Sequence, residues 1–275
     1  MPGRIERGTA AMQMGGRVFR NQPALGVFPL LSLLVVGGAY GLLALLVLHF
    51  GLLGDVFTNK LLQYGAMFLA LSISSLCGIF FNAAVVACTA RYFRGEPVSV
   101  RAGLRDAWAV RWTVLKWGLI SASIGTVLFI LEDNLPGFGS LVRAVLNVAW
   151  GLLTFFIVPV IVVERVDAVR PGLRQSGETF RRTWGESVTA ELGIALVMLP
   201  VAFGGIVLLG AAFLLASGPA AIALGVLGSV LLVATVVVTQ VLGMVVRTAL
   251  YHYATTDEPV DLVDELGHYD VFPES

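Results

Sequence analysis

Charged residues are scarce in this sequence of 275 residues. Asp, Glu, Lys and Arg make up 13% of the chain, whereas 57% of its residues are hydrophobic. A soluble domain carries about 25% charged residues, so this composition excludes an ordinary water-soluble protein and requires a lipid environment. The formal net charge of +0 offers no excess of basic residues, and we expect no nucleic-acid partner.

Cysteine and histidine are also rare, and their spacing suits neither a disulfide nor a metal site. Cys77 and Cys88 lie eleven residues apart in one apolar stretch. On a helix this spacing is about 16 Å, too far for a disulfide. The three histidines, His49, His252 and His268, do not have the spacing of metal ligands. We expect no catalytic residues, no cofactor and no metal site.

Six long apolar stretches dominate the chain. A hydrocarbon core of about 30 Å takes about twenty helical residues, and each stretch is long enough to cross it. They are Val27–Phe50, Tyr64–Ala90, Thr113–Leu131, Phe138–Val163, Val188–Ala216 and Pro219–Val246. The sequence therefore predicts an all-α membrane protein with six transmembrane helices and no separate soluble domain.

The distribution of Lys and Arg predicts the orientation of these helices. Of 18 such residues, all except Lys60 and Arg143 fall in segments that lie on one side of the membrane if the six stretches span it. Loops rich in Lys and Arg stay in the cytoplasm. We expect a plasma-membrane protein with both termini in the cytoplasm.

The basic segments indicate a threefold pattern. Arg101-Ala-Gly-Leu-Arg105 precedes the third stretch, and Arg170-Pro-Gly-Leu-Arg174 precedes the fifth. A weaker copy, Arg17-Val-Phe-Arg20, precedes the first. We predict three helical hairpins, each preceded by a short amphipathic cytoplasmic segment. The expected divisions are a basic amino-terminal segment (1–26), a transmembrane domain (27–253) and an acidic tail (254–275).

Arginine and tryptophan lie together at the predicted membrane boundary. Indole rings prefer headgroup depth, where guanidinium groups can meet lipid phosphates. The candidate headgroup contacts are Arg101, Arg105, Arg111, Arg174, Arg181, Arg182, Trp112 and Trp184. Under the simpler interpretation these are ordinary cytoplasmic loops whose aromatic residues anchor helix ends. The expected partners are membrane lipids, including anionic ones, a second copy of the chain or another membrane protein.

A few polar residues lie within the apolar stretches. Arg143, Asn147 and Thr154 share one helical face, and Glu132 or Asp133 can neutralise Arg143 across a tight turn. This group forms either a small external vestibule or a hairpin capped by an ion pair.

Asn82 and Gln240 are candidates for hydrogen bonds between helices, and Asn82 joins the candidate polar cluster. Pro159 and Pro200 each permit a kink inside a span.

The end of the chain is acidic. After Arg247 it has no Lys or Arg but contains seven Asp and Glu residues. Either this tail docks on the cytoplasmic arginines and competes with anionic lipid, or it is a solvated terminus.

Three motifs carry a family resemblance that covers nearly the whole chain. They are Phe80-Phe-Asn-Ala-Ala84, Thr154-Phe-Phe-Ile-Val-Pro-Val-Ile-Val-Val-Glu164 and Arg181-Arg-Thr-Trp-Gly185. With them the chain resembles a prokaryotic six-helix membrane family of unknown function. It is similar, more distantly, to the membrane domain attached to some glycerophosphodiester phosphodiesterases. The resemblance implies a fold but no activity.

Three function classes remain open at this stage. The first is a non-catalytic membrane protein that organises lipid or partner proteins through a basic cytoplasmic face. The second is a transporter or channel for a small solute, and the third is a membrane-embedded lipid enzyme. A water-accessible cavity at mid-membrane would favour transport, whereas a closed bundle with a basic rim would favour the first class.

Overall fold

The computed structural model describes residues 4–135, 137–215 and 217–256, and every regular element within these ranges is a helix. Six helical spans are long and apolar enough to cross a membrane: Pro23–His49, Lys60–Phe93, Arg111–Asn134, Gly139–Val163, Trp184–Leu215 and Pro219–Thr255. They overlap the six predicted stretches and confirm the all-α, six-span prediction. The chain is a multi-pass membrane protein.

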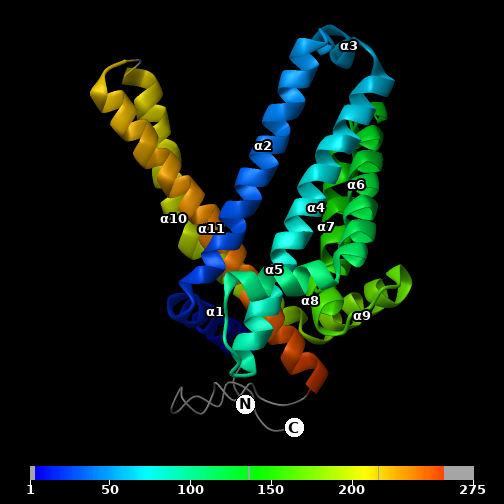
Figure 1. Ribbon diagram of the computed structural model, residues 1–275, viewed down its shortest axis with the longest axis vertical. Helices are drawn as coiled ribbons and strands as arrows, with labels where there is room; N and C mark the ends of the chain where they lie inside the picture. The colour runs from blue at the N-terminus through cyan, green and yellow to red at the C-terminus, as the bar shows by residue number, and fades with distance from the viewer. Residues whose placement is uncertain (1–3, 136, 216, 257–275) are drawn as a thin grey trace.

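Shorter helices connect and flank the spans (Figure 1). In chain order the elements are α1 (Arg4–Asn21), the 3₁₀ helix η1 (Pro23–Gly26), α2 (Val27–His49), α3 (Leu53–Thr58), α4 (Lys60–Phe93), α5 (Val100–Ala109), α6 (Arg111–Asn134), α7 (Gly139–Leu153), α8 (Ile157–Val163), α9 (Val169–Arg182), α10 (Trp184–Leu215) and α11 (Pro219–Thr256). Thus α1, α5 and α9 precede the first, third and fifth spans.

The fourth span is two helices rather than one. It breaks between Leu153 and Ile157, one turn before Pro159. A proline lacks the N–H that would bond to the carbonyl four residues earlier and clashes with that carbonyl, which favours a break near residue 155. Pro159 then lies in the first turn of α8, where the missing N–H costs little. Pro200, by contrast, lies inside a continuous α10.

The buried core gathers at one end of the long helices. In Figure 1, α1, α5, α8 and α9 lie together at that end, with the start of α2 and the last turns of α4 and α11. The largest fully buried side chains belong to this region and include Phe28, Trp117, Phe156, Ile161 and Tyr251. We call it the packed end.

Away from the packed end the helices separate. The α10–α11 pair leaves at an angle to α4, α6 and α7, and α2 diverges from α4 toward α3 (Figure 1). Many large apolar side chains are exposed there, among them Leu34, Leu45, Leu196 and Phe213. Lipid is as apolar as leucine, so these faces suit contact with hydrocarbon.

Glycine permits a close crossing of α10 and α11. A Cβ on Gly205 of α10 would lie 3.1 Å from the carbonyl oxygen of Gly228 of α11, and a Cβ on Gly228 would lie 2.8 Å from that of Gly205. The two backbones therefore pack directly, as small residues allow in membranes. Consecutive spans also contact each other in the α2–α4 and α6–α7 pairs. The equivalence of the three pairs as repeated hairpins stays a prediction, because α4 also packs extensively on α6. The acidic tail lies outside the described residues except for its first three.

Candidate functional site

The candidate lipid-contact residues lie at the packed end, on α5, α9 and the first turns of α6 and α10. Both α1 and the last described turn of α11 lie at this same end of the long helices (Figure 1). An even number of crossings requires this arrangement.

Helix α5 presents one face to the core and the other outward. Ser99 caps its start by accepting a hydrogen bond from the Ala102 amide at 3.2 Å. Gly103 and Ala107 are buried, whereas Arg101 and Arg105 are exposed. A Cβ on Gly103 would lie 2.6 Å from Cys88 Sγ of α4 and 2.7 Å from Phe28 Cζ of α2. The glycine thus lets α5 lie directly on two spanning helices.

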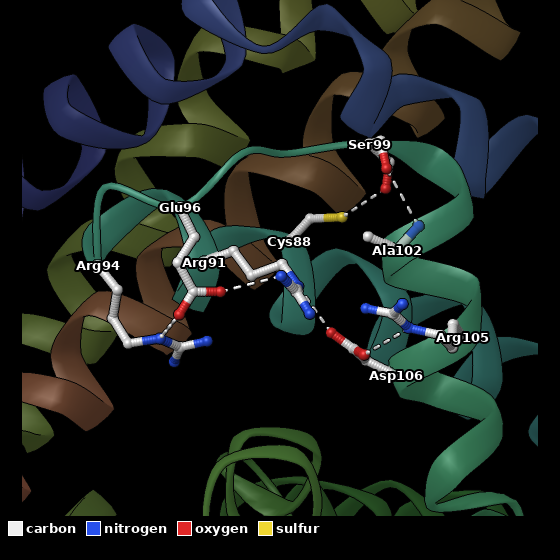
Figure 2. A network of polar contacts seen from close by, with 8 residues as sticks. All are labelled: Cys88, Arg91, Arg94, Glu96, Ser99, Ala102, Arg105 and Asp106. Carbon is white, nitrogen blue, oxygen red and sulfur yellow. Dashed lines mark hydrogen bonds and ion pairs between the residues drawn. The ribbon is translucent and has the colours of Figure 1, made fainter.

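A network of ion pairs joins the end of α4 to α5 (Figure 2). Arg91 Nε donates to Asp106 Oδ2 of α5 at 2.7 Å, and Arg91 Nη1 donates to Glu96 Oε2 at 2.9 Å. Arg94 Nε donates to the other oxygen of Glu96 at 2.7 Å, which holds the pKa of that carboxyl below its ordinary value. Arg91 therefore ties α4 to α5, and Arg94 holds Glu96 in the loop between them, whereas Arg105, 3.7 Å from Asp106, keeps a mostly exposed side chain.

Helix α9 repeats this arrangement. Gly172 is buried, and a Cβ there would lie 3.3 Å from the ring of Trp117 and 3.4 Å from Ile157. Ser176 Oγ accepts a hydrogen bond at 3.1 Å from the Phe156 amide, at the break between α7 and α8. In both Arg-x-Gly-Leu-Arg motifs, therefore, the glycine faces the core and the flanking arginines face outward.

The outer face of α9 is basic. Arg174 Nε donates to Glu178 Oε1 at 2.7 Å, an i,i+4 pair that the spacing allowed. This bond lowers the pKa of the Glu178 carboxyl. Arg181 and Arg182 are exposed at the carboxyl end of the helix, where cations are favoured by the helix dipole.

Tryptophans flank these arginines. Trp108, Trp112 and Trp184 are 61%, 64% and 55% exposed. The guanidinium carbon of Arg111 lies 5.5 Å from the ring centroids of both Trp108 and Trp112. Exposed indoles beside cations are typical of side chains at headgroup depth.

The predicted polar cluster is divided between two regions. Glu132 pairs with Arg143, but Asp133 pairs with Lys60 and accepts a 2.7 Å hydrogen bond from Tyr64. These two ion pairs lie at the end of the helices opposite the packed end.

The remaining members of that cluster lie elsewhere. Asn147 is exposed, and Thr154 donates to the carbonyl of Trp150 in its own helix at 2.8 Å. Asn82 of α4 accepts a 2.9 Å hydrogen bond from Gln240 of α11, as the candidate interhelical bond required. The structure therefore joins Arg143 to Glu132 but not to Asn147, Thr154 or Asn82.

Sequence reasoning missed two polar contacts at the packed end. Arg247 of α11 donates to Glu191 of α10 at 2.8 Å and lies 4.3 Å above the ring of Phe155. Tyr251 donates to Glu164 and accepts a 2.9 Å hydrogen bond from Gln175. The sequence signal for the Arg247–Glu191 contact was one charged residue within the fifth apolar stretch and another directly after the sixth. Over the described part of the chain, no three His, Cys, Asp or Glu side chains are grouped to hold a metal ion.

A comparison with known families finds a match that includes helices α5 and α9 and the arginine network. Residues 61–260 match the model of DUF6159, a family of unknown function. The chain belongs to this family. No curated protein and no solved structure matches the chain. The family region holds α5, α9 and the arginine network, whereas α1 and α2 precede it. The distant resemblance to phosphodiesterase membrane domains stays an expectation.

Proposed function

We propose that this protein is a non-catalytic membrane protein that gathers anionic lipids around its packed end, which we assign to the cytoplasmic side of the plasma membrane. The observation that carries the proposal is the shared orientation of two helices. On both α5 and α9 the glycine face is buried, and the arginines, with Trp108 and Trp184 nearby, are exposed. The alternative is that partner proteins, rather than lipids, bind the same exposed arginines.

The charge distribution supports this orientation. Segments rich in Lys and Arg remain in the cytoplasm, and the cytoplasmic leaflet is the anionic one. Each Lys or Arg near such a surface contributes about 1 kcal/mol of attraction. Several exposed arginines on two rigidly seated helices therefore supply enough energy to enrich anionic lipid locally.

Anionic-lipid enrichment in a bilayer tests the proposal. The protein is reconstituted with equal amounts of phosphatidylglycerol and phosphatidylcholine, and energy transfer from tryptophan to a labelled form of each lipid is compared. We expect preferential transfer to the anionic lipid that weakens as salt rises. The variant R101Q/R105Q/R174Q/R181Q/R182Q should lose that preference, whereas K60Q, at the opposite end, should keep it. Equal transfer to both lipids in the unmodified protein would refute the proposal.

Transport is the second candidate, because the span formed by α7 and α8 is broken and Asn82 and Gln240 meet within the spans. Broken helices frame the binding sites of many transporters. Solute-dependent swelling of proteoliposomes, abolished by N82L/Q240L, would favour transport over lipid organisation.

A further inference from the structure

An apolar groove opens on the side of the molecule between α2, α4 and α6. Its volume is about 330 Å³, within the range of about 300–1,000 Å³ that holds small-molecule ligands. Val35 of α2, Phe80 and Phe81 of α4 and Val114 of α6 line it, and Arg111 is the charged residue of the lining.

Helix α2 contacts the bundle on both sides of this groove, once toward the packed end and once farther from it. Toward the packed end, Phe28 is fully buried and meets the position of Gly103. On the other side, the Tyr40 hydroxyl donates to the Ala70 carbonyl of α4 at 2.8 Å and also contacts Ser74 Oγ. Val35 lies between these two contacts along α2 and remains 48% exposed. The groove is therefore a side opening held at both ends.

Arg111 contributes apolar atoms to the groove lining, and its guanidinium lies beside the rings of Trp108 and Trp112, toward the packed end. Arg111 is the first residue of α6, whereas Val114 and Leu115 lie about one turn further along the helix. Within the described chain Arg111 forms no ion pair with a carboxylate, and its Nη1 donates a hydrogen bond to the Trp108 carbonyl at 3.2 Å. A guanidinium with free donors at headgroup depth is complementary to a phosphate group.

The surroundings limit what can fill the groove. At hydrocarbon depth neither water nor a void is favourable beside Phe80, Phe81 and Val114, because water loses hydrogen bonds and a void loses dispersion contacts. The surrounding medium supplies acyl chains. Because those chains gain little hydrophobic energy on leaving bulk lipid, preference among lipids must come from the headgroup contact at Arg111.

We propose that this groove binds one acyl chain of an anionic phospholipid whose phosphate is held by Arg111 between Trp108 and Trp112. This inference rests on the proposed lipid-organising function and deepens it, since it adds one tightly held lipid to the exchangeable lipids around α5 and α9.

Lipid retention after extraction tests the site. The full chain is extracted in mild detergent from vesicles of equal phosphatidylglycerol and phosphatidylcholine with identical acyl chains. It is then washed at about 1 M NaCl, where the Debye length of about 3 Å screens exposed charges. Retained lipids are counted by native mass spectrometry. We expect the unmodified protein to retain phosphatidylglycerol about tenfold over phosphatidylcholine, as a charge-assisted contact allows.

Two pairs of variants separate the headgroup from the chain. R111Q should reduce the preference to less than about twofold, whereas K116Q, an equal loss of charge at an exposed lysine outside the groove lining, should not. V35W should fill the groove and remove most retained lipid of both kinds. L34W adds the same bulk at a side chain that is 72% exposed and outside the lining, and should retain lipid.

Each variant has one result that supports the lipid site and one that overturns it. Thermal unfolding and size-exclusion profiles report whether each variant folds, and L115W is the second groove-filling variant if V35W does not. An unchanged preference in R111Q overturns the headgroup contact, and equal retention in the folded groove-filling variant and L34W overturns the acyl-chain site. Equal low-salt energy transfer to both lipids in the unmodified protein, with intact phosphatidylglycerol retention at high salt, would refute the surface proposal alone.

Discussion

Replacement of Gly103 by alanine should loosen α5 from the spanning helices. The added Cβ would lie 2.6 Å from Cys88 Sγ, 2.7 Å from Phe28 Cζ and 3.0 Å from the carbonyl oxygen of Ala84. The first two atoms belong to fully buried side chains and the third to helix backbone, so none of them can move away easily.

The magnitude follows from two opposing effects. Overpacking a tight site costs about 1–3 kcal/mol, and three contacts of this kind favour the upper limit. Alanine regains about 1 kcal/mol of helix propensity over glycine. The net cost is about 2 kcal/mol, which raises the equilibrium for opening of α5 about thirtyfold, since 1.4 kcal/mol is a factor of ten.

Alkylation of Cys88 measures this opening. In a C77A background Cys88 is the remaining thiol, and it is buried beneath α5 with its Sγ donating to the Ser99 carbonyl at 3.5 Å. G103A should increase the rate of alkylation about thirtyfold if the thiol reacts only when α5 opens.

Two other glycines provide graded controls by thermal unfolding. At Gly177 of α9 the nearest atom to an added Cβ is Leu153 Cδ2 at 3.7 Å, so G177A should stabilise by the propensity gain of about 1 kcal/mol. At Gly172 the contacts of 3.3 and 3.4 Å are intermediate, and G172A should fall between the other two. A G103A protein with the parental alkylation rate and an unfolding temperature equal to that of G177A would refute this account of how α5 is seated.

Three further predictions concern polar contacts. The stability that the Glu96 ion pairs contribute is complete above the ordinary pKa of 4.5 and is lost as the pH falls through the pKa lowered by Arg94. A spin label in the loop between α4 and α5 should therefore gain mobility only in acid, and E96Q should show that mobility already at neutral pH. N82L and Q240L should each lower the unfolding temperature, and the double variant should cost less than their sum, since the interhelical bond contributes about 1 kcal/mol. S176A leaves the backbone amide at the α7–α8 break without its partner and should cost about 1–3 kcal/mol, read by thermal unfolding against S123A, whose hydroxyl bonds only its own helix.

The six spans were predictable because the signal is local. Hydrophobic length alone decides whether a segment can cross the bilayer, and each predicted stretch contains most of one observed span. The ends were less predictable, since α4 and α11 continue for 34 and 38 residues and enter the packed end as ordinary helices. The composition of the sequence indicates which residues lie in the hydrocarbon core. The end of a helix depends instead on its backbone hydrogen bonds, which continue beyond those residues.

The core of the packed end could not be read from the sequence. Phe28 meets the position of Gly103, and Trp117 meets that of Gly172. Each contact joins residues more than fifty positions apart in the sequence, so no local sequence pattern predicts it. The Arg-x-Gly-Leu-Arg repeat was visible as a repeat, but the outward direction of its arginines depends on where its glycine packs.

The candidate polar cluster illustrates the same limit. The partner of Arg143 was correctly expected to be Glu132 or Asp133 because the turn between them is short. The separate pairing of Asp133 with Lys60 follows only from the packing of α4 against α6, which brings the two helix ends together. The shared face of Arg143 and Thr154 has no such consequence, since those residues are about 16 Å apart along the helix.

The concentration of contacts at one end explains why the helices separate at the other. Without a hydrophobic force between helices in lipid, close approach requires small residues or polar bonds. At the packed end Gly15, Gly103 and Gly172 each bring a short helix against the spans. The Arg91–Asp106 ion pair holds α5 to α4, and the Arg247–Glu191 ion pair joins α10 to α11. Farther along, α2 has Tyr40 to join it to α4, while Gly37 and Gly41 meet no neighbour within 4 Å. Helix α2 is therefore held at Phe28 and at Tyr40, and the groove opens between these two contacts.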